Sequence, residues 1–150
     1  MTPEEAIRWT VLAILAGSLV IGVVGGLVTP VSGMWRDGDR LILLKQVAWL
    51  VRGTCVREGG HEVYRGTAVF GRVRLKRTAF GLPLLKSMGF APEFLPLLGG
   101  EPLARFDFKL SGAELDGTFE GRKFTFSKTP LAIRAVLRLP KEVRVWKRSP

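Results

Sequence analysis

The chain has 150 residues, a formal net charge of +10, and a single cysteine and a single histidine. One cysteine excludes an intrachain disulfide, and these two residues are too few for most self-contained zinc sites, which need three or four nitrogen or sulfur ligands. Only Glu4, Glu5 and Arg8 are charged among the first 35 residues, so residues 36–150 carry +11. That length is sufficient for one compact domain with its own core.

Residues 9–29 form an uncharged run of 21 residues. At a rise of about 1.5 Å per residue, a helix of this length crosses a hydrocarbon core of about 30 Å, so we predict a single transmembrane helix over 9–29. Residues 1–8 form an N-terminal flank in which Thr2 is the N-cap and Pro3 opens the helix. A cleaved signal peptide is the alternative. It is disfavoured because acids precede Arg8 and because the run is longer than a usual signal h-region.

Small residues recur along one face of this predicted helix. Ser18, Gly22 and Gly26 are spaced four residues apart, and Gly25 lies beside them. Small side chains at this spacing let two membrane helices approach closely, so these four residues are a predicted helix-packing face for a homo-oligomer or a partner helix. The alternative is that glycine and alanine are simply common in membrane helices.

The flanking charges predict the orientation. Arg8 is the one basic residue before the helix, whereas Arg36, Arg40 and Lys45 follow it closely. The positive-inside rule then predicts a single-pass protein of the plasma (inner) membrane with its domain in the cytoplasm.

Residues 30–39 are expected to form a short linker. Trp35 has the character of an interfacial residue at the headgroup level, and Asp37-Gly38 is a turn pair. A linker of this length would hold the domain close to the bilayer.

Residues 40–150 have the pattern of a basic, β-rich domain. Apolar and polar side chains alternate with a period of two, which predicts mainly antiparallel strands with one buried and one solvated face. We therefore predict an all-β domain, either a sandwich or a small barrel. The expected strands include a hairpin of 47–57 with 62–73 through Gly59-Gly60, a long strand over 63–77, and strands over 103–110, 122–128, 131–139 and from 143.

Residues 82–98 interrupt the strand pattern. Prolines at 83, 92 and 96 exclude a long central strand, and the many leucines predict a short helical insertion broken near Gly89. The insertion is either a plug over an open end or edge of the sheet, or an apolar lid that touches lipid.

A short β-solenoid is the alternative fold. A glycine-threonine pair recurs at Gly53-Thr54, Gly66-Thr67 and Gly117-Thr118. This recurring pair resembles the local sequence pattern of bactofilin-type cytoskeletal β-helices. The resemblance implies coils with glycine at the corners. The pairs follow no regular coil period, and we assign no family.

The cations of the domain form the predicted binding surface. Alternation places Arg72, Arg74 and Lys76 on one strand face. The full predicted anionic-partner-binding set is Arg72, Arg74, Lys76, Arg77, Arg122 and Lys123. The expected partners are the lipid bilayer, anionic lipid headgroups, and a protein partner or a second copy of the chain. Nucleic acid is disfavoured because few aromatic residues share the polar face: Tyr64, Phe70 and Trp146.

No phosphate-binding loop, nucleophile elbow or metalloprotease motif occurs in the sequence, and we expect no catalytic residue, metal or cofactor. The predicted function is a membrane-anchored, non-catalytic scaffold or binding subunit. One alternative is a carrier of lipid or another apolar ligand with 82–98 as its lid. The other is a membrane-bound enzyme with a site near His61, where Cys55 is a neighbour in the predicted hairpin.

Overall fold

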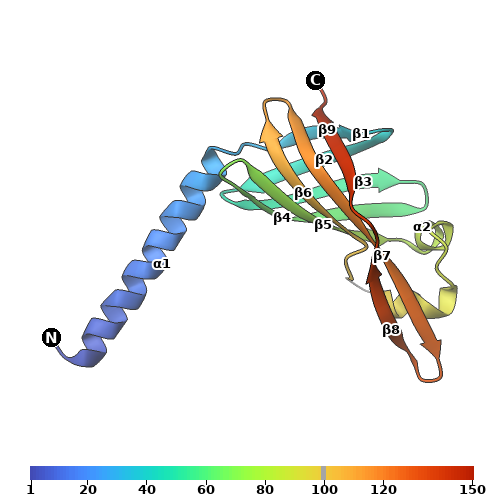
Figure 1. Ribbon diagram of the computed structural model, residues 1–150, viewed down its shortest axis with the longest axis horizontal. Helices are drawn as coiled ribbons and strands as arrows, with labels where there is room; N and C mark the ends of the chain where they lie inside the picture. Colours follow the sequence, from blue (N-terminus) through green and yellow to red (C-terminus); the bar gives the residue numbers. More distant parts are fainter. Residues whose placement is uncertain (99–100) are drawn as a thin grey trace.

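The computed structural model describes residues 1–98 and 101–150, and it begins with one long helix (Figure 1). Helix α1 spans Pro3–Leu27. Its start is the predicted one: Glu5 N donates to Thr2 Oγ1 at 3.2 Å, and Thr2 N donates to Glu5 Oε2 at 2.9 Å, which together make a capping box. The helix projects away from the rest of the chain, and it is long and apolar enough to cross a membrane.

Within the described part of the chain, eight antiparallel strands close into a barrel. Neighbouring strands follow the order β6-β5-β4-β3-β2-β1-β9-β7, and pairing of β6 with β7 closes the ring. The strands are β1 (Gly33–Asp37), β2 (Arg40–Val47), β3 (Leu50–Arg57), β4 (Gly60–Val69), β5 (Arg72–Phe80), β6 (Ala104–Ser111), β7 (Glu114–Lys128) and β9 (Glu142–Arg148). Of the two predicted all-β arrangements, the chain adopts the small barrel. The solenoid alternative is wrong, because a solenoid stacks parallel strands and these pairs are antiparallel.

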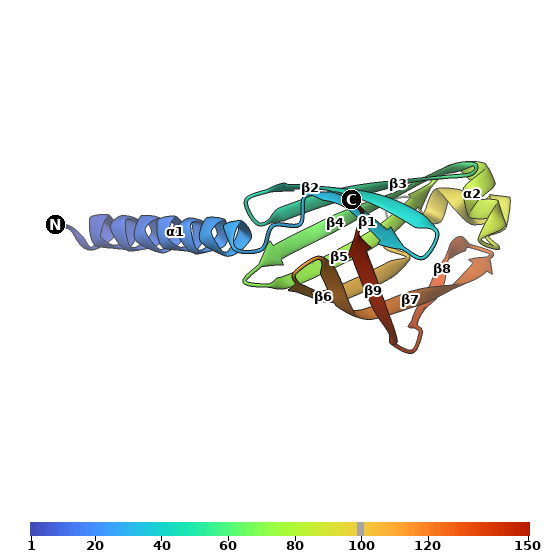
Figure 2. The same ribbon diagram turned by 90° about the horizontal axis from the view of Figure 1, so that it is seen from above.

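Strand β7 is twice as long as most of its neighbours and leaves the barrel. Its first half pairs with β6 and β9, and its second half pairs with β8 (Leu131–Arg138). Figures 1 and 2 show the second half and β8 as an arm that projects beyond the barrel.

The predicted helical insertion is present as α2 (Leu82–Ser87) and the 3-10 helix η1 (Pro92–Leu98). Its apolar side chains pack against the arm, where the rings of Phe94 and Phe126 stack at 4.4 Å between centroids. Leu85, Leu95, Leu98 and Leu103 form the buried centre of this second core. The insertion therefore covers the base of the arm at the end of the barrel opposite α1.

Large side chains fill the barrel. Tyr64 meets Trp146 edge to face at 5.5 Å, and Phe106 lies 5.0 Å from Trp146 between ring centroids. The largest buried side chains are Trp35, Trp146, Tyr64, Phe108, Ile42 and Leu44. Alternation explains the filling, because every second residue of each strand points inward.

One predicted strand is in fact two. The expected strand over 63–77 is broken by a two-residue turn at Phe70 and Gly71, where φ is +47° and +81°. Turns with two positive φ values suit the twist of a hairpin, but a bulky residue is rare in the first position. The turn also reverses the parity of the alternation. Tyr64, expected on the face of Arg72 and Arg74, therefore lies inside the barrel.

The predicted linker contains a barrel strand. Residues 33–37 form β1, and Trp35 is fully buried in the core, where its Nε1 donates to the carbonyl of Val31 at 2.8 Å. The interpretation of Trp35 as an interfacial residue is wrong. Five residues, 28–32, separate the last residue of α1 from the first residue of β1, so almost no free chain lies between the helix and the barrel.

The end of α1 is held by two barrel turns. The Phe70 amide donates to the Gly25 carbonyl at 3.1 Å, and Gln46 Nε2 donates to the Gly26 carbonyl at 2.9 Å. The last carbonyls of a helix lack partners within it, so these bonds cap α1 with its own barrel. Gly71 N adds a bond to Thr29 Oγ1 at 2.7 Å.

Three of the four predicted helix-packing residues lie at this junction. A Cβ added to Gly22 would lie 2.8 Å from the Trp49 ring, one on Gly25 would meet Val69 and Phe70, and one on Gly26 would collide with a backbone carbonyl. Ser18 alone is exposed and free of the barrel. The barrel therefore packs against most of the glycine face of α1. Only the part near Ser18 is open to a partner helix.

Candidate anion-binding face

The outer face of the barrel carries a row of cations across adjacent strands. The sheet register places Lys45 opposite Arg52, Arg52 opposite Arg65, Arg65 opposite Lys76, and Lys76 opposite Arg105. We call these five residues of β2 to β6 the basic band. Strands lie about 4.8 Å apart, so the band is about 19 Å long. Glu120 of β7, opposite Arg105, ends the row.

The charges of the band are not compensated within the described residues. None of the five side chains makes a salt bridge there, and four of them are exposed to solvent. Like charges directly opposite each other in a sheet are destabilising. The band is thus a cost to the fold that no described acid offsets before Glu120.

A groove of about 680 Å³ lies along the β5 to β7 side of the band. Its cationic lining residues are Arg65, Arg74, Lys76, Arg105, Arg138 and Lys141, and its acidic ones are Asp107 and Glu120. Thr67 and Thr118 add hydroxyl groups. Guanidinium, ammonium and hydroxyl donors in one groove are suited to carboxylate or phosphate oxygens.

Asp107 is already neutralised. Arg72 holds it with two bonds, from Nε to Oδ1 at 3.0 Å and from Nη2 to Oδ2 at 2.9 Å. These hydrogen bonds keep the pKa of the Asp107 carboxyl below its ordinary value. Arg74 adds a longer contact at 4.0 Å. The acid therefore cancels little of the positive charge of the groove.

One end of the groove is crowded with arginine. Burial, and then the charges of Arg105 and Arg138, lower the pKa of Arg122. The Nε atoms of Arg105 and Arg122 are buried without a hydrogen-bond partner among the described residues. Glu120 Oε1 lies 3.7 Å from Arg138 Nε. Unused donors and mutual repulsion make this end of the groove attractive to an anion.

The structure brings together only part of the predicted anionic-partner set. Arg74 and Lys76 line the groove, and Arg72 points outward beside it, occupied by Asp107. Arg122 lies next to Arg105 and Arg138, whereas Lys123 lines a separate groove against the insertion. Sequence reasoning missed Arg65, Arg105 and Lys141. A two-residue turn at 70–71 is the signal that would have placed Arg65 opposite Lys76.

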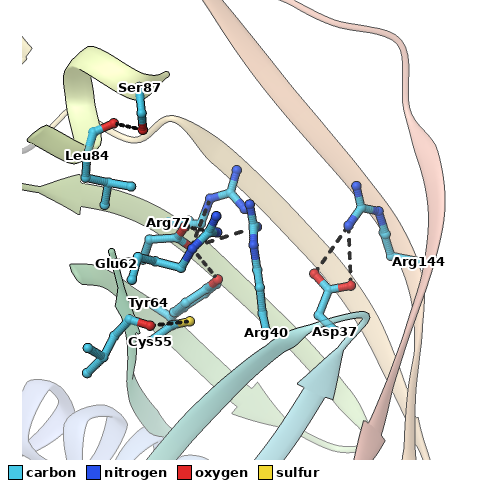
Figure 3. Close-up of polar contacts among 11 residues, drawn as sticks. Asp37, Arg40, Cys55, Glu62, Tyr64, Arg77, Leu84, Ser87 and Arg144 are labelled. Carbon is cyan, nitrogen blue, oxygen red and sulfur yellow. Dashed lines mark hydrogen bonds and ion pairs between the residues drawn. The ribbon is translucent and has the colours of Figure 1, made fainter. Parts of the chain in front are cut away.

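Arg77 belongs to a different cluster, inside the barrel (Figure 3). It follows Lys76 on β5 and therefore points inward, where its Nε lies 3.8 Å from Glu62 Oε2. Arg57 Nη1 lies 3.0 Å from Glu62 Oε1, and Arg40 Nη1 lies 3.8 Å from Oε2. The prediction that Arg77 shares the surface of Arg72 is wrong because Arg77 has the parity of the inward-pointing Val73 and Leu75 on β5.

Glu62 is a fully buried carboxylate with three arginines and one hydroxyl around it. Tyr64 Oη donates to Glu62 Oε2 at 2.9 Å, and burial and the nearby carboxylate raise the pKa of that tyrosine. Arg144 and the buried Asp37 form a second pair at the same end of the barrel, at 3.3 Å. These arginines have acidic partners, so they close the barrel end rather than recruit an anion.

The predicted enzyme site near His61 does not assemble around its two expected members. Cys55 points into the core, where burial and the charge of Glu62 raise the pKa of its thiol, while His61 points outward and stacks on Phe80 at 5.3 Å. Neither side chain can reach the other across the strand. The described residues hold no group of three or more His, Cys, Asp or Glu side chains that could bind a metal ion.

The carrier hypothesis requires an apolar cavity beneath 82–98. The described side chains occupy the barrel interior, with Phe106 and Phe108 packed against Trp146. Phe124 and Phe126 lie on the arm and pack against the insertion. The apolar residues of the insertion thus complete a second core.

Comparison with known family models, curated proteins and solved structures gives no match for this chain.

Proposed function

We propose that this chain is a membrane-anchored, non-catalytic binding subunit whose basic band holds an acidic surface of a partner protein. The observation that supports it most is the row of five cations on five adjacent strands with no described acid between them. An acidic partner would supply the counter-charges that residues 1–98 and 101–150 do not place beside the band. Arginine forks at positions 52, 65 and 105 favour paired contacts with carboxylates.

The height of the band favours a protein over the lipid surface. If α1 crosses the bilayer, the turns at its end mark the membrane side of the barrel. Lys76 is five residues beyond Gly71 along β5, about 17 Å of strand. Attraction to an anionic leaflet fades within a Debye length of about 8 Å at physiological salt. Lys45 and Arg52 are nearer to the turn, and the band rises away from the bilayer toward Arg105.

The positions of the aromatic residues favour a protein over nucleic acid. Single-stranded nucleic acid binds where exposed rings stack on its bases. Tyr64 and Trp146, which were candidates for such a platform, are buried in the barrel core. Phe70 is exposed, but it lies at the α1 junction rather than beside the band.

The side of the membrane is part of the proposal. Arg36, Arg40 and Lys45 follow α1, whereas only Arg8 precedes its apolar run, so we place the barrel on the cytoplasmic side of the inner membrane. Ser18, exposed on α1, leaves part of the small-residue face open to a partner helix or a second copy.

The test uses the full chain in nanodiscs of neutral lipid and fluorescent poly-L-glutamate as the acidic probe. The double variant Arg65→Glu with Lys76→Glu is expected to weaken binding at least tenfold at low salt. The control Lys128→Glu with Arg134→Glu makes the same change in net charge on the arm, and it is expected to weaken binding less than threefold. Equal losses in the two variants would overturn the proposal. Tighter binding of a single-stranded oligonucleotide of equal charge would favour nucleic acid instead.

A further inference from the structure

We propose that the barrel turns beside α1 enter the headgroup region of the bilayer, while the rest of the barrel stands above it. The inference rests on the membrane anchoring in the proposed function. Four apolar side chains make up this turn collar: Val47, Trp49, Leu50 and Phe70. They belong to the β2–β3 and β4–β5 connections, which are the two turns that hold the end of α1.

The collar lies beside the last turns of α1 and not beyond the end of the helix. The Trp49 ring packs beside Gly22, which lies five residues before the last residue of the helix, Leu27. Five residues correspond to about 7.5 Å along the helix axis. A bilayer that covers α1 to its end therefore also covers the level of Trp49.

Helix length makes this contact necessary for a spanning helix. A bilayer that stopped short of Trp49 would leave residues 9–21 in lipid, about 20 Å of helix, against a hydrocarbon core of about 30 Å. Extension in the other direction is blocked by the charges of Arg8, Glu5 and Glu4. The apolar length needed for crossing is reached only when the collar lies at the interface.

The collar has the chemistry of an interfacial surface. Val47 is 75% exposed, Leu50 56% and Phe70 60%, in continuity with the exposed apolar side of α1 at Leu27. Tryptophan, here Trp49, favours the headgroup level. Phenylalanine and leucine, here Phe70 and Leu50, are typical of the apolar side of elements that lie in the membrane interface. The hydrogen bonds from Phe70 to Gly25 and from Gln46 to Gly26 fix the collar to the helix, so its depth is set by the helix.

Spin-label depth measurements on the full chain in liposomes test this inference. Cysteine is introduced singly by Val47→Cys, Leu50→Cys or Phe70→Cys and labelled with a nitroxide; Cys55 is buried, and the parent chain reports any background labelling. The controls are Val56→Cys and Val143→Cys, equally apolar positions that are 86% and 79% exposed at the other end of the barrel. The measured quantity is the ratio of oxygen collisions to collisions with a water-soluble nickel reagent.

The three collar positions are expected to show a ratio several-fold higher than the two controls. Equal ratios at all five positions would overturn the inference. Leu15→Cys, in the middle of α1, separates this failure from failure of the anchoring itself: a lipid-like ratio there with water-like collar positions rejects the collar alone. A water-like ratio at Leu15→Cys would reject membrane anchoring, and the collar with it.

Discussion

Two groups of arginines in this barrel differ in their surroundings and in their roles. Arg40, Arg57 and Arg77 converge on Glu62 inside the barrel end, whereas Arg52, Arg65 and Arg105 stand outside among other cations. The inner group has its counter-charge within the chain. The outer group has no salt bridge among the described residues, which is the physical basis for assigning it to a partner. Lys76 and Arg77 are adjacent on β5, but Lys76 points out of the barrel and Arg77 points into it. The side of the strand on which a cation lies therefore decides its role.

Removing the buried carboxylate is expected to have the largest effect. Glu62→Gln leaves the three inner arginines without their anion, and breaking a buried ion pair in this way costs about 3–5 kcal/mol in the free energy of unfolding. Denaturant unfolding of the full chain in detergent measures the change. Glu58→Gln, in the exposed β3–β4 turn, is the control and should stay within about 0.5 kcal/mol. A small effect of Glu62→Gln would mean that the inner group is not held by its carboxylate.

Neutralising a residue of the outer band is expected to act in the opposite direction. Arg65→Gln removes repulsion from Arg52 and Lys76, which lie directly opposite it, so the unfolding free energy should be unchanged or rise by up to about 0.5 kcal/mol. The same unfolding assay measures it. A loss of more than about 1 kcal/mol would show that Arg65 has a structural partner and would remove the distinction between the two groups.

The smallest expected effect is a pH dependence at the rim of the groove. The bonds from Arg72 lower the pKa of Asp107 in the folded protein. The ionised carboxylate is therefore stabilised in the folded state relative to the unfolded chain. Their contribution to stability is present at neutral pH and is lost as pH falls below the ordinary aspartate range near about 4. Asp107→Asn should therefore flatten the decline of the melting temperature slightly below that pH. An unchanged profile would show that the pair contributes nothing, as for many exposed pairs.

Local signals in the sequence predict the helix and the class of the domain. The uncharged run and the pairing of Thr2 with Glu5 fix α1, because helix length and capping depend on neighbouring residues. Period-two alternation predicts antiparallel strands, and the prolines of 82–98 predict the insertion. Closure of the barrel depends on pairing of β1 with β9 and of β6 with β7, for which the sequence contains no local signal.

The site was harder to predict because it depends on register. One unrecognised turn, with Phe70 at positive φ, reversed the parity of a predicted strand and moved Tyr64 from the surface to the core. Arg77 lies inside because it has the parity of the buried Val73 and Leu75 on β5. The same turn places Arg65 opposite Lys76. The glycines of α1 were predicted to form a face for another helix. Three of them, Gly22, Gly25 and Gly26, pack against the barrel, which no helical spacing can reveal.

The most direct test of the outer band compares two adjacent residues. Lys76→Met and Arg77→Met remove one charge each from the outside and the inside of β5, and both are measured in neutral-lipid nanodiscs for poly-L-glutamate affinity and melting temperature. Lys76→Met is expected to weaken binding several-fold with an unchanged melting temperature. Arg77→Met is expected to lower the melting temperature while the affinity of the folded protein stays within twofold. Equal affinity losses in the two variants, or none in Lys76→Met, would contradict the assignment of the band to an acidic partner.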